Sequence, residues 1–504
     1  MSNLADLKVA LWQREVHEGS PSRSREELAD AVQRATELGA DCLVTTAFDW
    51  DGMPDVIPCG ASTAEYGESF VTLHTDDGDY RIGMGSPLRE CDFSVLIDNA
   101  CWTKDAQGSA APDIGVPSIV VAPVGIRNAG HAVRCFDGGA AVYDAQGEIL
   151  CALRDDFEEE FVVVSLVEPG TIAQPCDRKL LKALISTIRR FDGQVLGGSL
   201  PWIIGLSGGL DSTIVASLLV LALGKSRVIG YSLSSEYNTT ATKGNSARLA
   251  DALGIRFYAA TIGDTVHAVE STAESCGYER ERIEGLVHEN VQARTRGSLL
   301  CTFAAIEGGV VANNGNFVES ALGYCTLYGD AIGALAPIAD LTKVELFDLA
   351  RDINATFGAE VVPGNLLPQL TDDGYTWETM PSAELSEGQR DPMKWFYHDW
   401  LVRKLRDDPD FGAADALEAY RDDRLESEGM GTWIRFYGLD DTQAFISDLE
   451  WVLRQMHSAV FKRIQAPPAI ILNNPGIAWG DGEVQRRWEP DERYLELKEQ
   501  LLGS

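Results

Sequence analysis

The stretch that decides the fold reads Trp202-Ile203-Ile204-Gly205-Leu206-Ser207-Gly208-Gly209-Leu210-Asp211-Ser212. Its apolar first half predicts a buried strand, and its two adjacent glycines predict a turn. The apolar residues that continue from Thr213 to Leu219 predict a helix directly after the turn. Backbone N–H groups at such a turn, and at the start of the following helix, point toward a bound anion. The stretch therefore predicts an anion-binding turn at the end of a strand.

The side chains of this turn favour a phosphate together with a divalent cation. Ser207 and Ser212 offer hydroxyl donors, and Asp211 offers a carboxylate for the cation. Gly208 and Gly209 leave room for a ligand close to the main chain. A Walker loop would carry a lysine just before its final Ser or Thr, and Asp211 stands there instead. The sequence thus favours a phosphate site that is not a Walker loop.

Strands and helices alternate on both sides of the turn. We expect helices over 177–191, 212–223 and 241–253, and strands over 202–206, 227–232 and 256–260. This alternation predicts an α/β domain with a doubly wound parallel sheet, in which ligands bind beyond the carboxyl ends of the strands. Residues after about 405 are expected to be helical and heavily charged.

The chain before the turn-rich segment 168–175 has another pattern. We expect strands over 8–13, 41–45, 93–97, 117–122 and 161–166. A helix is expected over 25–38, with Ser24 as its N-cap and Glu27 completing a capping box. The pattern fits an α/β domain or a pair of stacked sheets. We predict two domains, 1–172 and 173–504.

The composition limits the partners. The chain has 504 residues, with 77 acidic and 42 basic side chains and a net charge of −35. That charge argues against nucleic acid or an anionic membrane as a partner. The apolar run 214–223 is too short to span a bilayer, and residues 1–6 lack the basic and apolar regions of a signal peptide. The ten cysteines form no C-x-x-C pair. We expect a soluble, cytoplasmic protein.

Later segments carry further side chains suited to a nucleotide and a metal. Residues 289–297 place Asn290 and Arg294 near one helix face, where Arg294 could bind a phosphate; a solvated surface helix explains these residues equally well. Asn314 follows the apolar run 309–312, so we expect it at a strand end. Glu319 is the carboxylate that we expect beside Asp211 around Mg²⁺.

The last of these segments supply a fixed cation and a loop. Asp330 ends the segment 323–330, and Lys343 is expected to stabilise a phosphate or a developing negative charge. Ser382 lies in the Pro-Ser-Ala-Glu-Leu segment 381–385, which Gln389 and Asp391 follow.

Taken together, residues 176–470 resemble the NAD synthetase family of ATP pyrophosphatases, above all its glutamine-dependent, two-domain form. The segment 461–468, Phe-Lys-Arg-Ile-Gln-Ala-Pro-Pro, is similar to a tail motif of that form. The resemblance implies an enzyme that adenylates the nicotinate carboxylate of deamido-NAD with ATP and Mg²⁺, after which ammonia displaces AMP. It also implies a homodimer or a higher homo-oligomer.

The resemblance also implies a role for each motif residue. Catalytic roles fall to Asp211, Asp330 and Lys343. ATP binding falls to Leu206, Ser207, Gly208, Gly209, Asp211, Ser212, Ser232, Asn314, Lys343 and Ser382. Contacts with deamido-NAD fall to Asn290, Arg294, Glu319, Asp330 and Lys343. Asp211 and Glu319 would hold the metal.

The chain departs from the family pattern at two places. Asn314 stands where a Thr is usual before Gly-Asn, and Pro392 stands where a Glu usually ends Gln-x-Asp-Glu. These departures keep open a related carboxylate as acceptor, or a different amine. A nucleotide-binding pseudoenzyme that senses NAD precursors is a further alternative, although the retention of Asp211, Glu319 and Lys343 together argues against it.

Residues 128–148 resemble the end of a nitrilase-type glutaminase domain, whose members use a Glu, a Lys and a Cys. Thr46-Ala47-Phe48-Asp49 stands where a Pro-Glu pair is expected, and the short strand 81–85 has no cysteine. The resemblance therefore implies a shortened, inactive α-β-β-α domain, with ammonia taken free or from a separate glutaminase. Cys101, near Lys104, is the only candidate nucleophile, and a small core residue is the simpler interpretation.

Overall fold

The computed structural model describes residues 3–17, 21–46, 55–85, 90–105, 115–382, 384–386, 391–473 and 483–503. The chain divides into two compact units: one comprises Met1–Ala129 and Val133–Val195, and the other comprises Gly130–Ala132 and Leu196–Ser504. Helix α2 (Lys179–Leu196) therefore falls almost wholly in the first unit, beyond the boundary that the linker predicts at residue 172. Helix α2 is held to the first unit by a hydrogen bond of 2.8 Å that Arg190 donates to the Phe157 carbonyl. No helix in the described ranges is long and apolar enough to cross a membrane.

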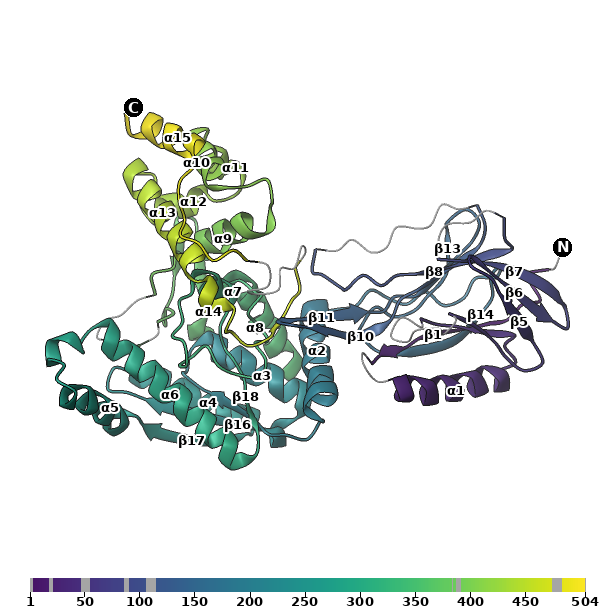
Figure 1. Cartoon of the computed structure of the whole chain (residues 1–504), viewed down its shortest axis with the longest axis horizontal. Helices are drawn as coiled ribbons and strands as arrows, with labels where there is room; N and C mark the ends of the chain where they lie inside the picture. Colours follow the sequence, from purple (N-terminus) through teal and green to yellow (C-terminus); the bar gives the residue numbers. More distant parts are fainter. Residues whose placement is uncertain are drawn as a thin grey trace. The chain divides into compact units, whose positions relative to one another are not determined.

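The second unit is built on a sheet with the strand order β17-β16-β15-β18. The strands are β15 (Trp202–Gly205), β16 (Val228–Ser234), β17 (Arg256–Thr261) and β18 (Val310–Val311), and their pairings are parallel. Between them come the helices α3 (Leu210–Leu223), α4 (Thr240–Leu253), α5 (Gly263–Ser275) and α6 (Leu286–Glu307), seen around the sheet in Figure 1. The predicted doubly wound parallel sheet is confirmed.

The apolar residues of β15 fix the position of the glycine turn. Successive side chains of a strand point to opposite faces of the sheet. Ile203 packs with Val266 of α5 and Ala304 of α6 in one buried cluster. Helix α3 is apolar on every side, and its Ile214 and Leu218 are fully buried. A helix of this kind has to lie inside the unit, so the turn between β15 and α3 is held firmly from both ends.

The rest of the second unit is mainly helical, as predicted for the residues after 405. It contains α7 (Phe317–Leu322), α8 (Lys343–Phe357), α9 (Tyr397–Asp407), α10 (Ala413–Arg421), α11 (Arg424–Ser427), α12 (Gly431–Phe436), α13 (Thr442–Ser458), α14 (Val460–Arg463) and α15 (Glu492–Gly503), with a hairpin of β19 (Gln369–Thr371) and β20 (Gly374–Thr376). Trp395, Tyr397 and Phe445 are almost fully buried between these helices. Phe396 stacks on Trp433 with ring centroids 4.1 Å apart.

The first unit consists of stacked sheets, one of the two arrangements that its sequence allows. One sheet has the order β14-β1-β3-β4 and the other β13-β12-β9-β8-β7-β6-β5. Strands β2, β10 and β11 pair with one another outside these two sheets. The strands are β1 (Val9–Gln13), β2 (Glu15–Val16), β3 (Cys42–Val44), β4 (Val56–Pro58), β5 (Thr63–Tyr66), β6 (Phe70–Thr75), β7 (Gly78–Met84), β8 (Phe93–Ile97), β9 (Ser118–Val121), β10 (Val124–Ala129), β11 (Ala132–Asp137), β12 (Ala141–Tyr143), β13 (Ile149–Ala152) and β14 (Glu160–Val164). Leu11, Val44, Ile82 and Val95 belong to their shared core. This unit therefore has a sandwich core.

Helix α1 (Pro21–Glu37) packs on the outer face of the β1 sheet through Leu28, Ala31 and Ala35. The prediction that Ser24 caps this helix is wrong, because the helix already begins at Pro21 and the Ser24 side chain is buried within it. Proline is favoured at the first helical position, where its missing N–H has no intrahelical partner to lose. Residues 47–49, where a Pro-Glu pair was expected, lie outside the described ranges.

Candidate phosphate-binding site

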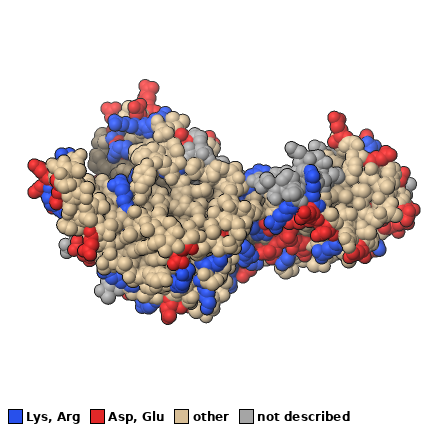
Figure 2. Space-filling view, turned by 60° about the horizontal axis from the view of Figure 1, so that its bottom comes forward, with Lys and Arg blue, Asp and Glu red and all other residues tan. Residues whose placement is uncertain are grey.

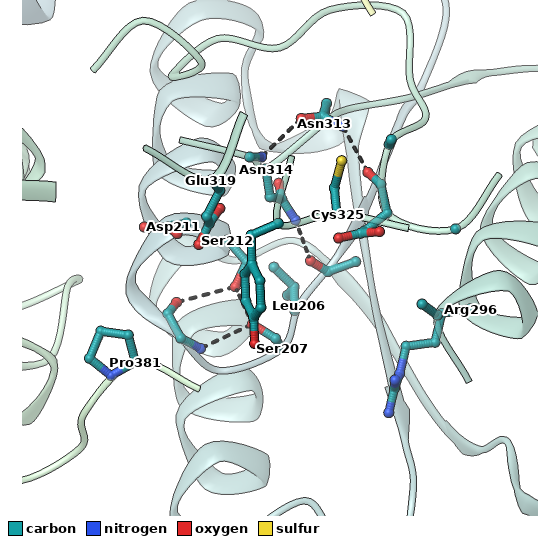
Figure 3. Close-up of a pocket in the computed structure, with 18 of the residues that line it drawn as sticks. Leu206, Ser207, Asp211, Ser212, Arg296, Asn313, Asn314, Glu319, Cys325 and Pro381 are labelled. Carbon is teal, nitrogen blue, oxygen red and sulfur yellow. Dashed lines mark hydrogen bonds between the residues drawn. The ribbon is translucent and has the colours of Figure 1, made fainter. Parts of the chain in front are cut away.

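The cavity of the second unit measures about 360 Å³ and lies where β15, β16 and β18 end. Most of the predicted site residues line it: Leu206, Ser207, Gly209, Asp211, Ser212, Ser232, Asn314, Glu319, Asp330, Lys343 and Ser382. Figure 3 shows Asp211 and Glu319 together beside Ser212, with Arg296 across the cavity from them. The parallel topology has thus brought together motifs that are far apart in the sequence.

The glycine turn is held by its own hydroxyl groups. Ser207 Oγ lies 3.2 Å from Ser212 Oγ and accepts a hydrogen bond from the Gly209 N–H at 3.2 Å. Gly208 does not line the cavity, but it determines the shape of the turn, with φ of +83°. A Cβ at Gly208 would lie 2.0 Å from the carbonyl oxygen of Thr242, so only glycine fits against α4 here.

A lysine and two carboxylates gather beside the turn. Lys343 Nζ lies 2.7 and 2.8 Å from the two carboxylate oxygens of Asp211. Asn316 donates from Nδ2 to Asp211 Oδ2 at 3.1 Å and caps helix α7, which carries Glu319. Lys343 begins helix α8, and its N–H donates to Asp399 Oδ1 at 2.7 Å. The caps of two helices therefore fix the positions of Glu319 and Lys343.

Because the cluster is buried, the charges of its members shift one another's pKa values. Burial and the neighbouring Asp211 raise the pKa of Glu319 to about 8, although Lys343 opposes the shift. Burial alone would lower the pKa of Lys343, but Asp211 and Glu319 outweigh it, so that pKa is raised. Lys343 therefore remains a cation in the ligand-free site.

Asp211 and Glu319 are suited to Mg²⁺, which prefers oxygen ligands and binds proteins through one or two carboxylates together with phosphate oxygens. Within the described ranges, no group of three or more His, Cys, Asp and Glu side chains could hold a metal ion by itself. Phosphate oxygens and water would complete the coordination.

Two asparagines connect the opposite side of the cavity to the strand ends. Asn313 Nδ2 donates to the carbonyl oxygens of Asp330 and Ile332, each at 2.9 Å. Asn314 Nδ2 donates to the Gly205 carbonyl at 2.9 Å. The Asp330 carboxylate accepts the Thr326 N–H at 2.6 Å, and burial raises its pKa. Asp330 is therefore positioned at the cavity by its own loop.

Asn290 and Arg294 do not line the cavity. Thr326 Oγ1 donates to Asn290 Oδ1 at 2.8 Å, and Arg294 Nε donates to the Leu327 carbonyl at 3.3 Å. Both residues tie helix α6 to the segment that leads to Asp330. Their contact with a substrate stays a prediction.

Arg296 is a cavity residue that the sequence reasoning missed. The face of α6 that lines the cavity consists of Ala293, Arg296, Gly297 and Leu300, which follow the helical period. Arg296 Nε donates to the Leu233 carbonyl at 2.8 Å, and burial lowers its pKa to about 10. The helical period groups these four residues on one face, but tertiary packing decides that this face is the one turned to the cavity.

The cavity also receives residues from two late segments. Glu384 accepts hydrogen bonds from Asn238 Nδ2 at 2.7 Å and Thr242 Oγ1 at 2.9 Å. Lys462 Nζ donates to the carbonyl oxygens of Gly323 and Cys325 at 2.6 and 2.7 Å. Asp391 also lines the cavity, whereas residues 389 and 390 lie outside the described ranges. No local pattern in the sequence points to these contacts.

A parallel sheet with a glycine turn after its strand β15, and a carboxylate and lysine cluster beside that turn, is the arrangement of the ATP pyrophosphatase class of folds. Residues 197–398 match the family model for NAD synthase. This segment is similar to NAD synthases, and the resemblance inferred from the sequence motifs is confirmed there.

Curated relatives match a longer stretch of the chain than the family model does, but only part of their own length is covered. A glutamine-dependent NAD(+) synthetase of Synechocystis sp. is 33% identical over 292 residues, covering 56% of this chain and 48% of that protein. The enzyme of the same name from Thermotoga maritima is 31% identical over 311 residues, covering 54% of this chain and 51% of that protein. The chain thus spans about half the length of these relatives.

Two solved structures cover nearly the whole chain. A glutamine-dependent NAD+ synthetase from Acinetobacter baumannii, in complex with ADP, has a TM-score of 0.61 at 18% identity and covers 91% of this chain and 94% of its own. One from Cytophaga hutchinsonii has a TM-score of 0.66 at 12% identity, covering 98% and 99%. These likenesses confirm the predicted fold, with a second fold unit before the parallel-sheet domain.

Proposed function

We propose that the chain is an ATP-dependent amide ligase that converts deamido-NAD and ammonia into NAD, with AMP and pyrophosphate as the other products. The observation that carries this proposal is the convergence of the glycine turn, Asp211, Glu319 and Lys343 on one cavity of an NAD synthase domain. The relatives named as NAD(+) synthetases support it.

The reaction has two displacement steps. A nicotinate carboxylate oxygen attacks the α-phosphorus of ATP, and the bond from that phosphorus to the bridging oxygen breaks to release pyrophosphate. Ammonia then attacks the acyl carbon, AMP leaves, and one proton is lost to give the amide. The N–H groups of the turn bind the phosphates, and Lys343 stabilises negative charge as it develops. Mg²⁺, when held by Asp211 and Glu319, would neutralise phosphate charge.

We also propose that the first unit has no glutaminase activity. Strand β7, from which the nitrilase resemblance would deliver the nucleophile, contains no cysteine. Burial raises the pKa of Cys59 to about 11 and that of Cys135 to about 12, so both thiols stay protonated at neutral pH. Because the thiolate is the nucleophilic form, these cysteines are poorly suited to attack glutamine.

The proposal is tested by identifying the products of the purified chain. ATP, Mg²⁺ and deamido-NAD are incubated with isotopically labelled ammonium, and the products are analysed by mass spectrometry. We expect labelled NAD, AMP and pyrophosphate in equal amounts. ATP turnover to ADP, or no turnover at all, would rule out the proposed reaction.

A related carboxylate is a second candidate for the acceptor. Asn314, which replaces a Thr of the family pattern, has a buried Oδ1 without a hydrogen-bond partner in the described part of the chain. A buried acceptor atom without a partner favours a ligand that donates a hydrogen bond there. Pyrophosphate release measured with a panel of pyridine carboxylate nucleotides would distinguish this acceptor from deamido-NAD.

We propose a homodimer formed through the β17 side of the second unit. Strand β17 is mostly exposed, with Tyr258 49% accessible, and Ile306 at the end of α6 is 74% accessible. Arg256 and Glu307 join these elements by an ion pair of 3.0 Å. Figure 2, which brings the side of α6 and β17 forward, shows a broad surface of uncharged residues. Exposed apolar side chains such as Tyr258 and Ile306, when they lie on one surface, often mark an interface. Ile306→Asp should reduce the mass measured by light scattering from that of a dimer to that of a monomer.

The ten cysteines are all free thiols. We take this as support for a reducing compartment such as the cytoplasm. Cell fractionation followed by detection of the protein would test this localisation. Rescue of a loss-of-function strain by added NAD would test the proposed product.

A further inference from the structure

The glycine turn has no basic residue of its own, and the adjacent helix supplies one. Residues 206–212 contain no Lys, Arg or His. Lys243 lies in the first turn of α4 and lines the same cavity as Ser207 and Gly209. We propose that Lys243 binds the terminal phosphates of the nucleotide, the task that a lysine within the loop performs in a Walker motif. This inference rests on the ATP-dependent function proposed above.

The close packing of α4 on the turn positions Lys243. A Cβ on Gly208 would lie 2.0 Å from the Thr242 carbonyl oxygen and 2.7 Å from its carbonyl carbon, to which the Lys243 nitrogen is bonded. Asn245 Nδ2, on the same helix, donates to the Gly208 carbonyl oxygen at 3.3 Å. The backbone of Lys243 is therefore next to the turn, within easy reach of its side chain.

The other basic side chains that line the cavity already have partners. Lys343 pairs with Asp211, Arg296 donates to the Leu233 carbonyl, Lys462 donates to the Gly323 and Cys325 carbonyls, and Arg463 pairs with Glu483. Lys243 is different: among the residues that the structure describes, its side chain has no ion pair or hydrogen bond. Its exposed ammonium group therefore keeps all its donors for a ligand.

The two lysines then serve different parts of the nucleotide. Lys343 lies in the carboxylate cluster, where the metal would bind. Lys243 lies at the turn, where the pyrophosphate would leave. Negative charge accumulates on pyrophosphate as its bond to the α-phosphorus breaks, and a cation placed there lowers the barrier. The contribution of Lys243 to binding affinity should consequently depend on the β- and γ-phosphates and be absent for AMP.

Binding measurements on the full chain test this assignment. Isothermal titration with ATP plus Mg²⁺, with inorganic pyrophosphate plus Mg²⁺, and with AMP would compare wild type with Lys243→Gln and Lys243→Arg. We expect Lys243→Gln to weaken ATP and pyrophosphate binding about 10-fold and AMP binding less than about 2-fold. Lys243→Arg should restore most of the ATP affinity. Lys225→Gln, an exposed lysine outside the cavity, is the matched control and should bind all three ligands like wild type.

The outcomes separate this inference from the proposed function. If wild type binds ATP and Lys243→Gln binds it equally well, the Lys243 assignment is wrong and the ligase proposal stands. An equal loss of AMP and ATP affinity would also overturn the assignment, because it would place Lys243 at the nucleoside or in the fold. If wild type binds neither ATP nor pyrophosphate, both proposals fail.

Discussion

Lys343 Nζ contacts both carboxylate oxygens of Asp211, at 2.7 and 2.8 Å, although the two residues belong to different helices, α8 and α3. Only 2% of Lys343 is accessible to solvent. A buried ion pair of this kind contributes little net stability, but removing one partner leaves the other charge buried and unpaired. Asp211 therefore has two roles that experiments must separate: it holds Lys343, and it is the proposed metal ligand.

Asp211→Asn should lower the rate of pyrophosphate release by at least about 100-fold, because the phosphates lose a charged metal ligand and Lys343 loses its anchor. It should also lower the free energy of unfolding by about 3 kcal/mol. Steady-state kinetics and urea unfolding would measure the two effects. Asp264→Asn, at an exposed carboxylate in the first turn of α5, is the control and should change neither. Normal pyrophosphate release by Asp211→Asn would refute the proposed role.

Gly208→Ala should abolish ATP binding and destabilise the second unit. The positive φ costs about 1–2 kcal/mol for a residue with a Cβ. The clash with the Thr242 carbonyl oxygen costs about 1–3 kcal/mol more. Gly224→Ala separates these effects, because Gly224 has φ of +86° and nothing within 4 Å of an added Cβ. Unfolding by urea should show the conformational cost alone in Gly224→Ala, with ATP binding intact. Equal losses in the two variants would contradict the packing argument.

Ammonium should support turnover, and glutamine alone should support it at less than about a hundredth of that rate, because strand β7 contains no cysteine and burial keeps the Cys59 and Cys135 thiols protonated. Cys101→Ala should leave ammonium-dependent kcat/KM unchanged. The comparison is a coupled assay for NAD with each nitrogen donor. Efficient glutamine-dependent turnover that disappears in Cys101→Ala would show that the first unit is an active glutaminase.

The stability of the helical part should depend on pH through Asp448. Burial alone would raise the pKa of this carboxyl group, but hydrogen bonds from His398 and Lys394 outweigh it, and the pKa is lowered from 3.8. A lowered pKa contributes stability above the unfolded value and loses it as the pH falls through the folded value. Asp448→Asn should thus reduce the free energy of unfolding by about 2 kcal/mol at pH 7 and by less at pH 3.5.

Urea unfolding of wild type and Asp448→Asn at both pH values would measure this difference. Asp415→Asn is a suitable control, because the Asp415 carboxylate pairs with the exposed Arg493. A difference between wild type and Asp448→Asn that stays constant with pH would show that Asp448 does not titrate with folding.

The sheet and its turn were predictable because they depend on local patterns. The apolar strand 202–206, two glycines and an apolar helix suffice for the turn, and parallel strands place their carboxyl ends at one edge. The side that α6 turns to the cavity was less predictable: Arg294 and Arg296 lie two positions apart and hence on different faces, and tertiary packing decides which face is inward. Glu384 and Lys462 reach the site through contacts across long separations in sequence, which no periodicity encodes.

The bonds from Lys462 to the carbonyl oxygens of Gly323 and Cys325 have a consequence for the order of synthesis. Chains fold from the N-terminus while the ribosome still makes the rest. The turn at 206–212 can form early, but the cavity stays open on one side until the segment 462–469 has emerged. A nucleotide cannot stabilise the domain by mass action before the site that binds it exists. Nascent chains of this protein must therefore rely on their own packing until the segment 462–469 has emerged, and stabilisation by ligand begins only then.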